Sequence, residues 1–129
     1  MGSVTVDSSA WPLVRVTYVG SVDDARFEEY VREQAALLER RKPYVILFDA
    51  SESGMPSARQ RQRMAEYARE HEAELRRYCK RGVFVIPNSV VRGALTAILW
   101  LQPLPFPHEV VSSLNEAEER LGAETRLFA

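Results

Sequence analysis

An acid and several serines stand close together between an apolar run and a long charged segment. These candidate polar site residues are Asp49, Ser51, Ser53 and Ser57. Ser57 is placed to open a helix, where free backbone N–H groups attract an anion, and three arginines follow within two turns. This pattern suits a phosphate or a phosphoserine. It equally fits an ordinary capped turn, in which the Ser57 hydroxyl satisfies the backbone N–H groups.

The other residues with catalytic or metal-binding chemistry are isolated in the sequence. His71 and His108 have no second ligand at a metal-binding spacing, and Cys79 has no recognisable catalytic partner. Asp49 has neither a histidine nor a paired carboxylate beside it. We therefore expect no enzyme active site, no metal and no cofactor.

The composition is that of one globular domain. The chain has 129 residues, 46% of them hydrophobic and 27% charged, and we predict a single domain over 1–129 with its core at about 4–122 and a loose tail at 123–129. A net charge of -1 argues against nucleic-acid partners. The single cysteine, the lack of a signal-peptide pattern and the lack of a long apolar run lead us to expect a soluble cytoplasmic protein without a transmembrane segment.

A buried strand must position the polar candidates. Residues 44–48 are all apolar, which is typical of a strand covered on both faces. We expect a polar loop over 49–57 after it, and then a helix over about 57–80. In open α/β sheets the binding site usually lies at the carboxyl end of such a strand.

The remaining segments complete an α/β pattern. Period-two alternation predicts an antiparallel hairpin from strands at 3–7 and 13–19. Further elements are expected as a helix ending near 41, a strand at 83–86, a helix at 90–101, a strand at 109–112 and a helix from 115 to a stop at Gly122. The order is β-β-α-β-α-β-α-β-α, and helical crossovers make the last three strands parallel. We predict a mixed five-stranded sheet with helices.

The helix at 90–101 and the proline-rich loop after it carry more apolar surface than one helix needs to cover a sheet. The candidate residues are Leu95, Ile98, Leu99, Trp100, Leu104 and Phe106. A helix that is apolar nearly all round must be covered on every side. Plain core packing, a partner subunit or an apolar pocket could each provide the cover.

This order, with the strand-loop-helix at 44–57, resembles the STAS domain, and more closely its SpoIIAA-like branch, which is similar to the lipid-carrying CRAL-TRIO (SEC14) fold. The stretches that carry the resemblance are 14–20, 45–49, 81–87, 109–111 and 115–117. In the anti-sigma factor antagonists of this family, a loop carries a phosphorylated serine at a helix start. Here Met55 and Ser57 match that loop, but Pro56 replaces its acid and Ala58 stands at the phosphoacceptor position. Ser57 could substitute only if the register shifts by one residue.

The resemblance implies a bacterial, non-catalytic regulatory or signalling module that binds protein partners or forms a homodimer. The expected contact regions are the Trp100–Phe106 region and the 51–57 loop. A second hypothesis, from the similarity to the SEC14-like fold, is a module that binds a lipid or another apolar small molecule. It predicts a cavity bordered by the helix at 90–101 and the proline loop.

Overall fold

The computed structural model describes residues 2–101 and 103–125, without the side chains of 94, 98, 100, 101 and 123–125. Its elements follow one another in the order β1 (Ser3–Ala10), β2 (Leu13–Gly20), α1 (Asp24–Glu39), β3 (Tyr44–Ser53), α2 (Ala58–Glu70), α3 (Glu72–Tyr78), β4 (Cys79–Val85), α4 (Ser89–Leu101), β5 (His108–Val111) and α5 (Leu114–Thr125). None of the helices in this part of the chain has the length and hydropathy of a membrane span.

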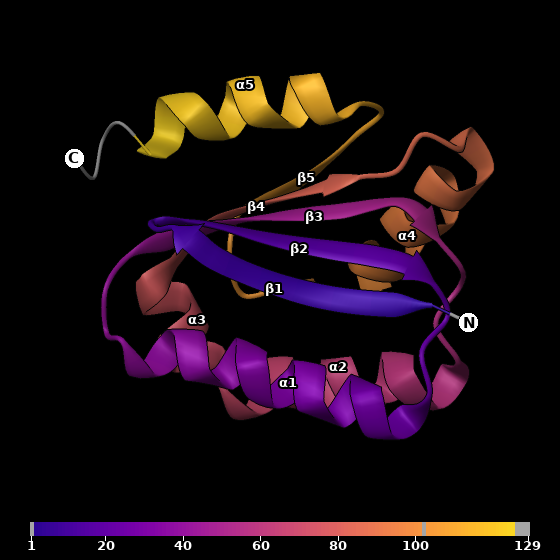
Figure 1. The fold of residues 1–129 in the computed structure, drawn as a ribbon, viewed down its shortest axis with the longest axis horizontal. Coiled ribbons are helices and arrows are strands. Elements are labelled where there is room, and N and C mark those ends of the chain that lie inside the picture. Colours follow the sequence, from indigo (N-terminus) through magenta and orange to yellow (C-terminus); the bar gives the residue numbers. More distant parts are fainter. Residues whose placement is uncertain (1, 102, 126–129) are drawn as a thin grey trace.

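The described strands form a five-stranded sheet whose spatial order is the chain order, β1-β2-β3-β4-β5 (Figure 1). β1 and β2 form the predicted antiparallel hairpin, and β2, β3, β4 and β5 run parallel to one another. The predicted α/β class and mixed five-stranded sheet are therefore confirmed. β3 is the central strand, and its first five residues are all buried, as the apolar run predicts.

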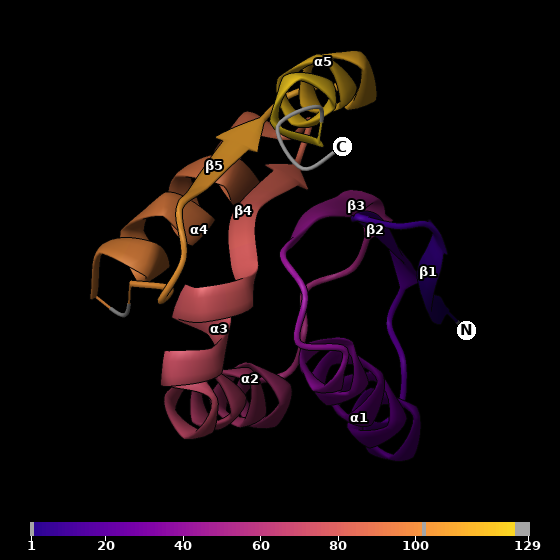
Figure 2. The same cartoon turned by 90° about the vertical axis from the view of Figure 1, so that its left-hand side faces the viewer.

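Two apolar layers cover the two faces of the sheet. α1, α2 and α3 lie on one face and α5 lies on the other, while α4 stands beside β4 and β5 (Figures 1 and 2). Ile46 and Phe48 belong to the layer under α1–α3, whereas Val45 and Leu47 belong to the layer under α5. The alternation of side chains along β3 thus divides one apolar run between two cores.

The single helix that we expected over 57–80 is wrong. His71 leaves helical geometry, with φ -113° and ψ 23°, and separates α2 from α3. The chain then becomes extended at Cys79, which pairs with Tyr44 of β3, so β4 begins four residues before the predicted strand. Pairing with the central strand outweighs the helical pattern in this segment.

Further boundaries also differ from the predictions. β1 continues to Ala10, three residues beyond the predicted strand. β3 does not end at residue 48, because Glu52 and Ser53 still pair with Val19 and Gly20 of β2. Ser51 and Ser53 are therefore strand residues and not loop residues. α5 continues through Gly122 to Thr125, so this glycine does not stop the helix.

Candidate apolar ligand site

A cavity of about 570 Å³ lies between the sheet, α1, α2, α3, α4 and the loop that follows α4. The sheet contributes Ile46, Phe48 and Phe84 to its floor. Its walls come from α1, α2, α3, α4 and the proline loop. The wall residues include Met64, Ala65 and Ala68 on α2, Val91, Leu95 and Leu99 on α4, and Pro103, Leu104, Pro105 and Phe106 on the loop. The lining is therefore aliphatic and aromatic for most of its extent.

Aromatic rings pack against one another at the floor of the cavity. Phe48 and Phe84 are register partners on β3 and β4, and their rings stack with centroids 4.4 Å apart and planes 6° apart. Phe106 lies over Gly82 of β4, where an added Cβ would come within 2.7 Å of the ring. Gly82 N–H also donates to the Pro107 carbonyl at 2.9 Å. The absence of a side chain at Gly82 thus lets the proline loop close over the sheet edge.

Several polar side chains face the interior of the cavity, and all of them are uncharged. Tyr30 Oη accepts a hydrogen bond from Gln34 Nε2 at 2.9 Å, and its ring packs edge-on against the Tyr18 ring with centroids 5.3 Å apart. Burial raises the pKa of Tyr30 to about 12 and the pKa of the Cys79 thiol to about 12. Burial also raises the pKa of Tyr67. These groups consequently stay neutral at physiological pH.

The side of the cavity next to solvent has a different character. Arg61, Arg69 and Glu72 are the charged side chains among the described lining residues, and all are exposed. Met55 and Val91 also line this side and are 57% and 37% exposed. The site is thus an apolar interior that opens through a partly charged rim.

The predicted apolar candidates fall mostly on this cavity. Leu95, Leu99, Leu104 and Phe106 line it and are partly buried. The side chains of Ile98 and Trp100 lie outside the described residues. Sequence reasoning missed the contribution of α2 and of the tyrosines, although Tyr67 is on the apolar stripe of its helix. That stripe does not reveal whether a residue faces a core or a cavity.

The predicted polar candidates are satisfied by near neighbours along the chain. Asp49 Oδ1 accepts from Ser51 Oγ at 2.6 Å and from Ser51 N–H at 3.1 Å. Ser53 Oγ donates to the Gly54 carbonyl at 2.7 Å, and Ser53 lies at the edge of the cavity. Ser57 Oγ accepts from Gln60 N–H at 3.1 Å as the N-cap of α2. Asp49 and Ser51 are thus hydrogen-bonded to each other, whereas Ser57 is an ordinary N-cap of α2.

The arginines after Ser57 do not converge on one point. Arg59 lies 3.8 Å from Asp24 Oδ2, and Arg61 donates to the Pro56 carbonyl at 2.6 Å. Arg63 Nε donates to Glu28 Oε1 at 3.1 Å. Each guanidinium therefore has a partner within the chain, and the arrangement does not favour a phosphate site at this helix start.

Replacement of Ser57 with alanine is expected to lower the free energy of unfolding by about 1 kcal/mol, since the Gln60 N–H loses its acceptor. Chemical denaturation measures the effect. Ser57→Asp is the control, because aspartate is an equally good N-cap and should retain wild-type stability. A Ser57→Ala variant as stable as the wild type would contradict the capping role.

Comparison with known proteins tests the fold. No protein-family model matches the sequence, and no curated protein matches it. A crystal structure of an uncharacterised DUF3478-family protein from Shewanella loihica PV-4, described as having a SpoIIAA-like fold, superposes with a TM-score of 0.68 at 16% sequence identity. The match covers 93% of each chain. The fold is SpoIIAA-like. The resemblance to the SpoIIAA-like branch of the STAS domain, which we inferred from the sequence, is thereby confirmed for the fold.

Proposed function

We propose that this SpoIIAA-like protein is a non-catalytic module that binds an apolar small molecule, such as the acyl chain of a lipid, in the cavity between the sheet, α2 and α4. The observation that carries the proposal is the cavity itself, with its volume of about 570 Å³. Small-molecule sites typically measure about 300–1,000 Å³ and are lined mainly by apolar and aromatic side chains.

The distribution of charge supports an apolar ligand. The charged lining residues are exposed at the rim, and the described interior offers aromatic rings, aliphatic side chains and neutral hydroxyl, amide and thiol groups. Catalysis by an acid-base pair requires two titratable groups that converge on one point. Burial raises the pKa of the interior tyrosines and of Cys79, so these groups stay protonated and none of them acts as a base at physiological pH. Binding without chemistry therefore suits this cavity better than an enzymatic reaction.

Native mass spectrometry of freshly purified protein, with a denatured intact mass from the same sample, tests the proposal. We expect a folded species that carries a few hundred daltons of extra mass, which is lost on denaturation. Extraction of the denatured sample into organic solvent should recover the molecule for identification. A ligand-free sample that also fails to bind fluorescent apolar probes would contradict the proposal.

A variant that blocks the cavity sharpens this test. Ala65 lines the cavity from α2 but is not part of the packed core layers, so an indole at this position extends into free space. Ala65→Trp should weaken binding of the neutral probe N-phenyl-1-naphthylamine by more than about tenfold, or about 1.4 kcal/mol. Fluorescence titration measures the change. Ala36→Trp, on the exposed side of α1, is the matched control and should bind as the wild type does.

A regulatory module that binds a protein partner or a second copy of itself is the second candidate function. Val90, at the start of α4, is 78% exposed and does not line the cavity. Met55 and Val91 add exposed apolar surface at the rim. Exposed apolar clusters of this kind often mark protein interfaces.

The two candidate functions respond to different substitutions. Val90→Asp should disrupt an assembly through α4 while leaving probe binding intact, whereas Ala65→Trp should do the reverse. Light scattering coupled to size-exclusion chromatography reports the assembly state of each variant. A wild-type dimer that Val90→Asp converts to a monomer, with no bound mass in either, would replace the ligand-binding proposal with the interaction module.

A further inference from the structure

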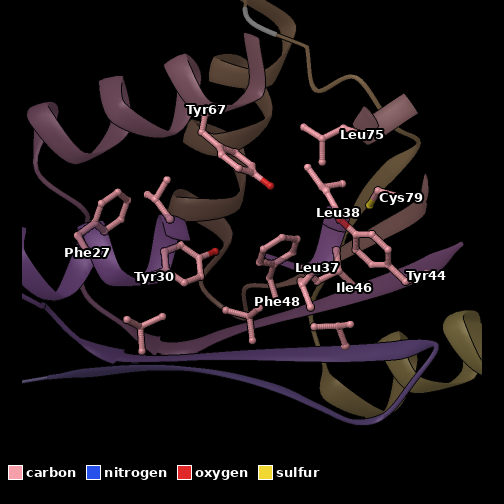
Figure 3. Packing of buried hydrophobic residues seen from close by; sticks show 14 residues of the cluster. Phe27, Tyr30, Leu37, Leu38, Tyr44, Ile46, Phe48, Tyr67, Leu75 and Cys79 are labelled. Atoms are coloured by element: carbon pink, nitrogen blue, oxygen red, sulfur yellow. The ribbon is translucent and has the colours of Figure 1, made fainter. Parts of the chain in front are cut away.

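The tyrosine on α2 that faces the cavity has an unusual hydroxyl. Tyr67 is 4% exposed, and its Oη is buried without a hydrogen-bond partner among the described residues. Figure 3 shows the side chain directed from α2 toward the sheet, with its oxygen in the interior. A buried polar group without a partner costs free energy, which a suitable partner restores. The hydroxyl is thus placed to donate to a molecule in the cavity.

The neighbouring tyrosines do not share this property. Tyr30 Oη accepts a hydrogen bond from Gln34 Nε2 at 2.9 Å. The hydroxyl oxygens of Tyr18 and Tyr44 are not among the buried side-chain atoms that lack a partner in the described part of the chain. Among the described lining residues, the side-chain oxygen that is buried without a hydrogen-bond partner is Tyr67 Oη.

The charge of the surroundings decides which acceptor fits. The charged residues among the described lining are exposed at the rim, so a carboxylate brought to Tyr67 would be buried without a cation. Because burial raises the pKa of Tyr67, its phenol remains a neutral donor. A neutral oxygen acceptor gains the hydrogen bond without the cost of burying an ionic charge.

We propose that Tyr67 anchors a neutral carbonyl oxygen, as in an ester or a ketone, at the inner end of an otherwise apolar ligand. This inference rests on the proposed function, because it assigns a polar group to the molecule that the cavity binds. According to this inference, Tyr67 contributes to the binding of apolar molecules with a carbonyl group, but not to the binding of hydrocarbons or fatty-acid anions. The Phe48–Phe84 stack and the wall residues of α4 would contact the apolar part of the ligand.

Competition against N-phenyl-1-naphthylamine with matched ligands tests the inference. The ligands are methyl decanoate, dodecane and decanoate, each titrated at pH 8. Wild-type protein should prefer methyl decanoate over decanoate, because the anion would be buried without a cation. Tyr67→Phe should weaken methyl decanoate binding by about 3- to 10-fold, which corresponds to one hydrogen bond, and leave dodecane unchanged. Tyr78→Phe, a partly buried tyrosine outside the lining, is the control and should match the wild type.

The outcomes separate this inference from the proposed function. One outcome is that methyl decanoate and dodecane both bind, with affinities for Tyr67→Phe equal to those for the wild type. In that case Tyr67 does not anchor a carbonyl, but the proposal of apolar ligand binding stands. If neither ligand nor the probe binds, apolar binding itself is wrong. A second measurement needs no ligand. Tyr67→Phe should raise the midpoint of thermal unfolding of the ligand-free protein, and a lowered midpoint would show that the hydroxyl already has a partner in solution.

Discussion

Replacement of Leu47 with alanine is expected to lower the free energy of unfolding by about 3–5 kcal/mol, a large part of the stability of a domain of this size. Leu47 is fully buried in the central strand and packs in the layer beneath α5. Neighbouring strands and α5 confine the site, so the surrounding side chains cannot collapse into the space that the leucine leaves. Chemical denaturation followed by circular dichroism measures the loss.

Phe48→Ala provides the matched comparison. Phe48 is the next residue of β3, but its side chain faces the opposite layer and borders the cavity. Its ring already has free space on one side, so its removal forfeits fewer packing contacts. We expect a loss of about 2–3 kcal/mol, less than for Leu47→Ala, although phenylalanine is the larger residue. A greater loss for Phe48→Ala would indicate that the cavity is closed around this ring in solution.

Stability is expected to fall steeply in alkaline solution. Burial raises the pKa of Cys79 to about 12 from its model-compound value of 9.0. Between these pH values the unfolded chain releases the thiol proton while the folded protein retains it. The stabilising contribution is complete below about pH 9 and is lost as the pH rises toward 12. Cys79 contributes a loss on the order of 1 kcal/mol per pH unit within this window.

Urea denaturation at a series of pH values from about 8 to 11 tests this expectation. Cys79→Ala removes the titrating thiol, so its stability should fall less steeply with pH than that of the wild type. The pKa of Tyr30, raised to about 12 by burial, adds to the decline in both proteins above about pH 10. Equal slopes for the two proteins would contradict the assignment of this loss to Cys79.

The sheet was predictable because its strands have clear local patterns. The unbroken apolar run of 44–48 identifies a strand buried on both faces, and the alternation around Val14 and Val16 identifies the hairpin beside it. Helical segments between the later strands dictate parallel connections. These signals are local, so a single sequence is enough to give the order of the strands along the chain, the antiparallel hairpin and the parallel direction of the last three strands.

The element boundaries depend on contacts that the local pattern does not contain. The amphipathic pattern runs on through His71, and no glycine or proline marks the break there. Cys79 becomes a strand residue because Tyr44 offers it a pairing partner, and Ser53 remains in a strand because Gly20 lies alongside. Tertiary pairing of this kind overrides the intrinsic preference of short segments.

The candidate site was predictable only in part. The surplus of apolar residues around Leu95 and Phe106 indicated a surface that needed a cover or a ligand. The hydrogen bond from Gln60 N–H to Ser57 was predictable because caps are local. The position of Tyr67 was not predictable. Whether a hydroxyl on an apolar stripe faces a cavity depends on the spacing between α2 and the sheet, which the sequence does not show.

The chain-order arrangement of the sheet has a consequence for biosynthesis. Each strand after the first pairs with the one made just before it, so the sheet can grow as the chain leaves the ribosome. The layer that contains Val45 and Leu47, however, is covered by α5, at the C-terminal end of the described chain. Until α5 is synthesised, the nascent chain would thus expose one apolar face of the sheet. We expect stalled or truncated chains that lack α5 to require chaperones or to aggregate.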